Sequence, residues 1–158
     1  MFTARMPARI NFAFAAAVAL SACGATTTAH DAFEQLMGAD AGRILQSHRW
    51  HLDAATEASG RRLDALFPLS SRGFSLAFEG AMVVVHGACN TMRGSYELDA
   101  DGRLVVGRLA ATMKACEPAL MQADATLAKL LANPLRASLA QGTMPKIRLA
   151  TPSKESLM

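Results

Sequence analysis

Short runs of alternating or β-branched apolar residues recur along most of the chain from residue 49 onward. Residues 73–79 alternate between polar and apolar side chains, and residues 82–86 are mostly β-branched. The dipeptide Glu79-Gly80 between them is a turn signal. This pattern predicts a β-hairpin, because alternation with a period of two places one face of each strand on a core.

A second hairpin is predicted further along. Residues 95–98 and 103–106 are strand-like and flank a segment ending in Asp101-Gly102, a dipeptide typical of tight turns between strands. Three more segments have weaker strand patterns, namely residues 49–53, 135–139 and 146–149. Several short strands at this spacing favour an antiparallel barrel or sandwich.

One helix is predicted over about residues 117–132. Pro118 suits the first helical position, and Asn133-Pro134 provides a stop. An apolar stripe with helical spacing follows Pro118, formed by Leu120, Ala123, Leu127, Leu130 and Leu131. A shorter helix within residues 33–46 fits the spacing but contains Gly38 and Gly42. The predicted fold class is mainly β (α+β), a small antiparallel barrel-like sheet covered by one helix.

The first 22 residues have the pattern of an export signal. Arg5 and Arg9 precede an apolar run over residues 10–20, which is too short for a membrane-spanning helix. The following residues, 20–23, are Leu-Ser-Ala-Cys and resemble the lipobox of bacterial lipoproteins, in which the cysteine becomes the lipidated first residue. The alternative is an ordinary signal peptide that happens to contain Cys23.

These observations divide the chain into four parts: a lipoprotein signal peptide (1–22), a lipidated Cys23 with a tether and possible short helix (23–47), a folded domain (48–150), and a polar tail or incomplete last strand (151–158). A membrane anchor through Cys23 implies location in the cell envelope. Gly24 after the cysteine, rather than Asp, favours an outer-membrane lipoprotein facing the periplasm under the sorting rule of enteric bacteria.

Charge argues against a nucleic-acid partner. The whole chain has a formal net charge of +3, but Arg5 and Arg9 leave with the signal, so the remaining chain is at +1. Its other basic residues are scattered among carboxylates, and Arg61-Arg62 is an isolated pair. A nucleic-acid-binding domain would need a concentrated basic face.

Two cysteine-centred motifs resemble the META domain of the HslJ-like family of heat-shock-associated bacterial lipoproteins. The first is Gly-x-Cys-Asn-x-x-x-Gly-x-Tyr, and the second is Leu-x-Val-Gly-x-Leu-Ala-x-Thr-x-x-x-Cys. The matching positions, preceded by Trp50 in the first strand, are Gly87, Cys89, Asn90, Gly94, Tyr96, Leu104, Val106, Gly107, Leu109, Ala110, Thr112 and Cys116. The resemblance implies a small barrel-like sheet with helix cover in an envelope protein linked to heat and antibiotic stress. Ala88 and Lys114 depart from the family pattern, and so does the absence of a longer strand after residue 150.

Cys89 and Cys116 are the remaining cysteines once Cys23 is assigned to the anchor. The oxidising conditions outside the cytoplasm favour a disulfide between them, which would close a loop of roughly 28 residues and stabilise the fold by about 3–4 kcal/mol. The alternative is a pair of buried free thiols, because sequence alone does not place their Cα atoms within bonding range.

The other motif residues are expected to have structural roles. Asn90 and Gly94 suit a turn, since Asn tolerates left-handed geometry and Gly supplies a positive φ. Thr112 is expected to satisfy backbone groups near the start of the helix. His48, His51 and His86, even with Cys89 close to the last, lack metal-ligand spacing, so no metal or other cofactor is predicted.

Two classes of function follow. The first is a non-enzymatic, lipid-anchored envelope module that binds a protein partner or an apolar ligand; a role like that of secretin pilot lipoproteins is one version. The second is a small thiol-dependent enzyme or redox protein using Cys89 or Cys116, which would need a free, exposed thiol of lowered pKa. A ligand-binding version would need an apolar cavity lined by residues such as Phe74, Phe78, Val83, Val85 and Leu127.

Overall fold

The computed structural model describes residues 33–153 and 155–158. The expected signal peptide, Cys23 and the tether lie outside these residues. The helices are α1 (Ala39–Gln46), the 3₁₀ turn η1 (Asp64–Leu66) and α2 (Pro118–Leu131). The strands are β1 (Glu34–Gln35), β2 (Arg49–His51), β3 (Ala55–Thr56), β4 (Ser75–Glu79), β5 (Met82–His86), β6 (Thr91–Leu98), β7 (Arg103–Val106), β8 (Ala110–Ala111), β9 (Leu135–Ala140), β10 (Lys146–Ala150) and β11 (Ser156–Leu157).

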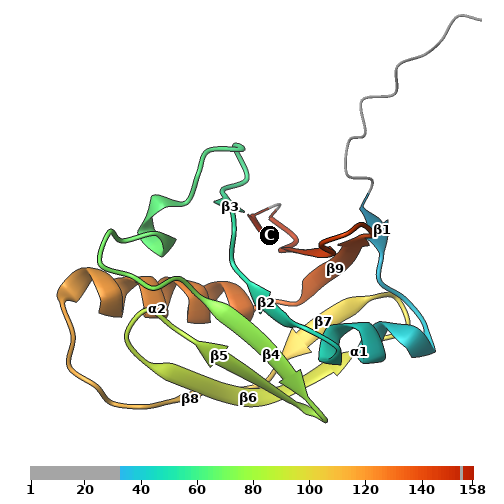
Figure 1. Ribbon diagram of the computed structural model, residues 1–158, viewed down its shortest axis with the longest axis horizontal. Helices are drawn as coiled ribbons and strands as arrows, with labels where there is room; N and C mark the ends of the chain where they lie inside the picture. The colour runs from blue at the N-terminus through green and yellow to red at the C-terminus, as the bar shows by residue number, and fades with distance from the viewer. Residues whose placement is uncertain (1–32, 154) are drawn as a thin grey trace, which may run out of the picture. The chain divides into compact units, whose positions relative to one another are not determined.

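The strands form one curled antiparallel sheet. Its path runs β2-β4-β5-β6-β7-β9-β10-β11-β3, while β1 pairs with β9 and β8 pairs with β6 off this path. The path starts at β2 and ends at β3, which follow each other closely in the chain, so the sheet bends round into a half-barrel (Figure 1). The mainly β prediction is confirmed.

Both predicted hairpins are present. In the β4–β5 hairpin, Gly80 occupies the turn at a φ of 59°, and in the β6–β7 hairpin Gly102 has a φ of 71°. These are left-handed conformations that glycine adopts without steric cost. At the second turn, the Arg103 backbone amide donates to Asp99 Oδ1 and its guanidinium contacts Oδ2. Both interactions hold the pKa of Asp99 below its ordinary value.

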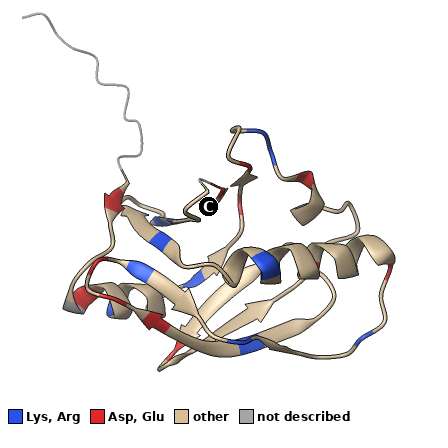
Figure 2. Cartoon of the chain, turned by 180° about the vertical axis from the view of Figure 1, so that it is seen from behind, with Lys and Arg blue, Asp and Glu red and all other residues tan. Residues whose placement is uncertain are grey.

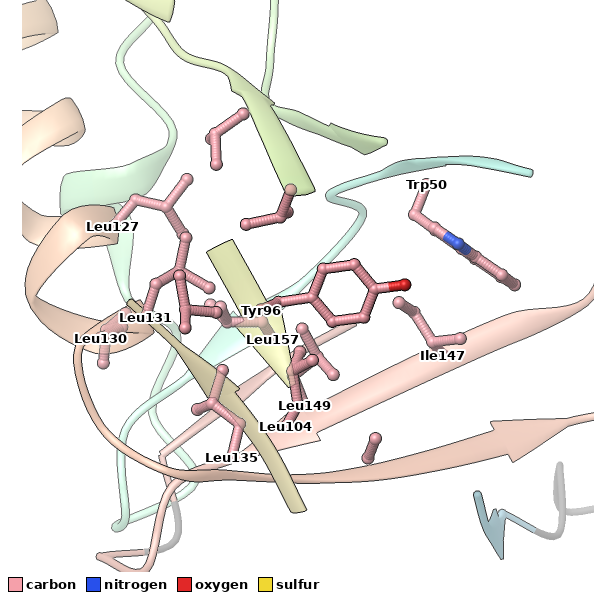
Figure 3. Close-up of a cluster of buried hydrophobic side chains, with 14 of the residues drawn as sticks. Trp50, Tyr96, Leu104, Leu127, Leu130, Leu131, Leu135, Ile147, Leu149 and Leu157 are labelled. Carbon is pink, nitrogen blue, oxygen red and sulfur yellow. The ribbon is translucent and has the colours of Figure 1, made fainter. Parts of the chain in front are cut away.

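Helix α2 covers the inside of the curved sheet. Pro118 is at its start as predicted, and its apolar stripe is buried except for the half-buried Leu120. Figure 3 shows Leu127, Leu130 and Leu131 of α2 directed toward side chains of the strands, including Tyr96 and Leu135. The predicted helix over about 117–132 therefore closes the hydrophobic core, whose apolar burial is the main stabilising contribution to the fold.

The short helix α1 lies beside β4 (Figure 1) and packs against the same hydrophobic core as α2. Ala41 and Leu45, on the inner face of this helix, are both buried. The Leu45 carbonyl accepts a hydrogen bond from Trp50 Nε1 at 2.9 Å, so α1 and strand β2 are connected directly. Gly42 does not interrupt this helix.

Residues 151–158 contain a short strand. Leu157 of β11 pairs with Leu149 of β10 on one side and with Ala55 of β3 on the other. Met158 continues this pairing by exchanging two backbone hydrogen bonds with Ala54, at 2.7 and 2.9 Å. The end of the described chain is thus inserted between two strands of the sheet.

Candidate functional site

The first candidate site is the connection between β5 and β6, where residues 87–90 turn the chain. We call these four residues the Cys89 turn. The Gly87 amide donates to the Asn90 carbonyl at 2.9 Å and closes the turn. Strand β6 then begins at Thr91, so the first cysteine motif starts in a turn and continues as a strand.

A disulfide connects this turn to the segment before α2. Cys89 and Cys116 are bonded, with Cα atoms 6.0 Å apart, inside the range that a disulfide spans. The predicted pairing is confirmed, and the alternative of two buried free thiols is wrong. The bond fixes the loop between β8 and α2 against the sheet.

Asp124 of α2 is the central polar residue of the site. Its side chain points into the Cys89 turn with only 6% of the residue exposed. It accepts backbone hydrogen bonds from Ala88 at 2.7 Å and Asn90 at 2.7 Å, and both oxygens lie 3.3 Å from the Cys89 amide. Three converging N–H groups form a concave anion-binding arrangement, here occupied by the protein's own carboxylate.

The sequence interpretation overlooked Asp124, although a signal was available. The residue directly follows Ala123, a member of the apolar stripe of the helix, and lies three residues before Leu127. A carboxylate on the buried face of a helix is rare unless a partner compensates its charge. Such a position therefore predicts a set of donors facing the helix, which the Cys89 turn supplies.

Asn90 extends the network to the second cysteine motif. Its Oδ1 atom accepts hydrogen bonds from Thr112 Oγ1 and from the Lys114 amide, each at 2.9 Å. The Thr112 hydroxyl oxygen in turn accepts from the Thr91 amide at 3.2 Å. Thr112 was expected near the start of the helix, but it bonds across to the beginning of β6 instead.

Close approach of neighbouring atoms explains the three motif glycines. A Cβ atom on Gly87 would collide with Asp124 Oδ1 and lie 2.6 Å from the Asn90 carbonyl oxygen. On Gly94 it would lie 2.9 Å from the Arg108 carbonyl oxygen, and on Gly107 it would collide with Ser95 Oγ. Gly94 lies within β6, opposite Val83, and is not among the glycines of positive φ. The prediction that it supplies a turn is wrong, because crowding rather than φ excludes a side chain there.

The aromatic motif residues belong to the core, away from the disulfide. Trp50 and Tyr96 are 7% and 8% exposed. The Tyr96 hydroxyl accepts a hydrogen bond from Gln46 Nε2 at 3.0 Å, and its ring meets Phe78 edge to face with centroids 4.9 Å apart. Both rings therefore pack in the core, and the polar atom of each, Tyr96 OH and Trp50 Nε1, has a hydrogen-bond partner.

Metal-ligating side chains do not gather in the described part of the chain. No group of three or more His, Cys, Asp or Glu residues in residues 33–153 and 155–158 could hold an ion. His48 instead contacts Ser47 Oγ and the Trp50 ring. The backbone amides of the Cys89 turn donate to Asp124, as described above.

A second region is an open groove between β2 and the first half of β10. It has a volume of about 460 Å³ and is lined by residues that include Trp50, His51, Asp53, Met144, Pro145 and Ile147. Figure 3 shows Trp50 and Ile147 extending toward each other from these two strands. Beneath the groove lies a small apolar pocket of about 30 Å³, against Phe74, Leu127 and Leu149. We call the region between the two strands the seam.

Comparison with known proteins now identifies the fold. The model of the META domain matches residues 43–158. The chain belongs to the META domain family. Its match begins within α1 and continues through β11, so it includes both the Cys89 turn and the seam.

Two solved structures share the fold of this META domain. An NMR structure of a protein from Burkholderia xenovorans is 20% identical, covers 96% of this chain and 95% of its own, and has a TM-score of 0.63. A second NMR structure is 23% identical, covers 73% of this chain and 91% of its own, and has a TM-score of 0.51. Among proteins of curated function, none matches this sequence.

The geometry explains why this META domain tolerates two departures from the family pattern. At Ala88 and Lys114 the site uses the backbone amide, which donates to Asp124 and to Asn90 respectively. Any residue type with a backbone N–H can supply these bonds, so the side chain can vary.

Proposed function

We propose that this META domain protein is a lipid-anchored envelope protein without catalytic activity, whose domain serves as a binding module. The Cys89–Cys116 disulfide is the observation that carries the proposal. A thiol-dependent enzyme needs a free thiolate, and the bond engages both thiols of the domain. The anchor rests on the lipobox-like residues that end in Cys23.

The Cys89 turn supports a structural rather than a catalytic role for the motif. The Asp124 carboxylate is engaged by three backbone amides, and Asn90 Oδ1 by two donors. A general base must reach a proton on its substrate, whereas these oxygen atoms are directed at the protein's own backbone. The most polar part of the domain therefore supports the fold.

The small volume of the inner pocket disfavours the apolar-ligand version. About 30 Å³ corresponds to roughly the space of one water molecule, whereas small-molecule sites usually enclose about 300 Å³ or more. Phe78, Val83 and Val85, expected to line a cavity, are each 3% exposed or less and belong to the packed core. A protein partner on the surface fits this packing better.

Charge also supports a protein partner over nucleic acid. Figure 2 shows basic and acidic residues interspersed over strands, loops and helices. Several form pairs of opposite sign, such as Arg61 with Glu57 and Arg103 with Asp99.

No helix within the described residues is long and apolar enough to cross a membrane.

The test is the intact mass of the protein extracted from membranes, measured with and without reduction before thiol alkylation. We expect a lipid adduct on Cys23 and no alkylation of Cys89 or Cys116 until the disulfide is reduced. A Cys23→Ser variant serves as the control and should leave the membrane fraction. Readily alkylated Cys89 or Cys116 would reinstate thiol chemistry, and an unmodified Cys23 would overturn the anchor.

A further inference from the structure

The outer face of the sheet contains an open pocket over β9, β10 and β11, which we call the Arg148 pocket. Its volume is about 430 Å³, and its described lining consists of Arg136, Arg148, Ala150, Thr151, Pro152 and Ser156. Both arginines alternate along their strands with buried residues, so their side chains leave the sheet on the face opposite the hydrophobic core. The described lining thus combines two guanidinium groups and two hydroxyl groups with no carboxylate.

The register of the sheet brings the two arginines together. In the pairing of β9 with β10, Arg136 lies opposite Ala150, and Arg148 lies opposite Ser138. The arginines are therefore diagonal neighbours on one face, a separation of about 7–8 Å that long side chains can bridge. Two like charges at this spacing repel each other, and an anion held between them would neutralise both.

The neighbouring arginine has its charge compensated, whereas Arg136 does not. Arg103 of β7 lies opposite Arg136 and forms ion pairs with Asp99 and Asp101, each at 2.8 Å. Arg136 Nη1 instead donates to the neutral side chain of Gln35, at 3.2 Å. The local carboxylates of β7 are therefore already used by Arg103.

The carboxylate on the other side of the pocket is also engaged. Glu155 follows the lining residue Thr151 in the turn between β10 and β11. Its Oε2 atom accepts hydrogen bonds from Thr151 Oγ1 at 3.4 Å and from Ser153 Oγ at 3.1 Å. Neither arginine of the pocket forms an ion pair with Glu155 within the described residues.

Arg148 is held in position but lacks an acceptor. Its guanidinium carbon lies 4.0 Å from the centroid of the Phe33 ring, and a stacked guanidinium keeps its N–H donors at its edge for planar acceptors. The Nε atom is buried and has no hydrogen-bond partner within the described residues. Buried donors without a partner are rare in native proteins, and an ion is one of the partners that account for them.

We propose that the Arg148 pocket binds a phosphomonoester group, whose oxygen atoms accept hydrogen bonds from Arg136 and Arg148. A phosphomonoester has a charge of about −1.5 to −2 at neutral pH, which matches two guanidinium groups. Arginine also suits phosphate because its fork of donors binds two oxygens at once. This site goes beyond the proposed function, since it requires neither the lipid anchor nor a protein partner.

A phosphomonoester could come from a soluble phosphorylated molecule or from a lipid headgroup. Phe33, which stacks on Arg148, lies ten residues after Cys23. A chain of that length spans at most about 36 Å, so a domain anchored at Cys23 would have headgroups within reach. The two sources share the same chemistry at the pocket and are separated by the experiment.

The test is a calorimetric titration of the mature protein, in non-ionic detergent micelles, with inorganic phosphate at constant ionic strength. We expect saturable binding and a shift of the Arg148 Nε–H resonance in nuclear magnetic resonance spectra. Dimethyl phosphate, a diester with one negative charge, should bind at least about tenfold more weakly, because it matches only one arginine. The absence of saturable binding, or equal affinity for dimethyl phosphate, would overturn the proposal.

Variants separate the pocket from general charge attraction. Arg148→Gln should abolish binding, and Arg148→Lys should weaken it about tenfold because lysine keeps the charge without the planar fork. Arg136→Gln should also weaken binding, whereas Arg72→Gln, at an exposed arginine outside the pocket lining, should leave it unchanged. Unchanged affinity in the Arg148 and Arg136 variants, or an equal loss in Arg72→Gln, would overturn the proposal.

Thermal unfolding confirms that the variants remain folded. Phosphate should raise the unfolding temperature of the unmodified protein, because a ligand that binds the native state stabilises it. The same concentration should not raise that of Arg148→Gln. If Arg148→Gln does not fold, Arg148→Lys and Arg136→Gln provide the same comparison. An equal rise in the unmodified protein and in a folded Arg148→Gln variant would contradict the site.

Mixed micelles identify the source of the phosphate group. Phosphatidic acid exposes a phosphomonoester and should displace inorganic phosphate if the headgroup is the ligand, whereas phosphatidylcholine, a diester, should not. Phosphate binding without displacement by phosphatidic acid would support the pocket and assign it to a soluble molecule. Phosphate binding to a protein without lipid on Cys23 would support the pocket and contradict the anchor. An anchored, disulfide-bonded protein that ignores phosphate would contradict the pocket alone.

Discussion

The Cys89 turn and the seam differ in how completely their backbone groups are used. In the turn, the amides of Ala88, Cys89 and Asn90 all donate to Asp124, and a disulfide holds the same residues to the loop before α2. At the seam, two strands present backbone groups for which the described chain supplies no strand partner. The turn is bonded within the domain, whereas the seam is a pair of strand edges to which the described residues add no strand.

This difference separates stability from recognition. Residues that satisfy one another inside a fold contribute to its free energy of unfolding, but have little left to offer a ligand. Open strand edges contribute less to stability and invite an added strand, so native proteins usually cover or protect them. The family motif of this domain accordingly marks the region that supports the fold, while the seam lies largely outside the motif.

The largest effect should come from the disulfide. Replacing both Cys89 and Cys116 by alanine removes the cross-link between residues separated by 27 positions. The free energy of unfolding should fall by about 3–4 kcal/mol, because the unfolded chain regains the entropy of an open loop. Urea unfolding followed by circular dichroism measures the change. Reduced wild-type protein is the matched control, and a loss in the variant without a similar loss on reduction would assign the effect to packing instead.

Removing the Asp124 carboxylate should have the next largest effect. Asp124→Ala leaves three buried or half-buried amides of the Cys89 turn without an acceptor. We expect a loss of about 3 kcal/mol, since each unsatisfied buried donor carries a desolvation cost. Lys129→Ala, at an exposed position of the same helix, should change stability by less than about 0.5 kcal/mol. Equal effects of the two substitutions would refute the role given to Asp124.

Asn90 should contribute less, because it connects exposed loop groups. Asn90→Ala removes the acceptor shared by Thr112 Oγ1 and the Lys114 amide. A loss of about 1–2 kcal/mol is expected, together with faster hydrogen exchange at Lys114. Ser70→Ala removes a single exposed contact with Glu117 at the same end of α2 and should have almost no effect. An Asn90 variant as stable as the Ser70 variant would show that the loop is held by the disulfide alone.

The sequence predicted the elements well where local pattern decides them. Strand β5 and β7 and helix α2 occur at their predicted positions within a residue or two, because alternation, turn glycines and the N-terminal proline act locally. The disulfide was also predictable, since the export-signal pattern and the count of cysteines restrict the expected pairing. The inferences about strands and helix needed only residues close in the chain, and the inference about the disulfide needed only the number of cysteines and the expected oxidising conditions.

Features that depend on distant residues were not predictable in this way. Gly94 was interpreted as a turn residue, yet it is required by the approach of the Arg108 carbonyl, which only the folded sheet brings near. Asp124 acts through amides 34 to 36 positions away. The seam was not predictable either, because only the path of the whole sheet brings β2 and β10 to the two sides of one groove.

The smallest effect on stability should come from the seam itself. Arg49 and His51 are exposed, and the described structure gives their side chains no hydrogen bond or ion pair. Arg49→Ala and His51→Ala should each change the free energy of unfolding by less than about 0.5 kcal/mol, as is usual for surface positions without specific contacts. Thermal and urea unfolding provide the measurement, with Arg72→Ala as the matched surface control. Near-neutral values would mean that these two side chains contribute little to the fold. A loss comparable with that of Asn90→Ala would instead indicate that the edge of β2 is already bonded, in which case the seam would belong with the Cys89 turn.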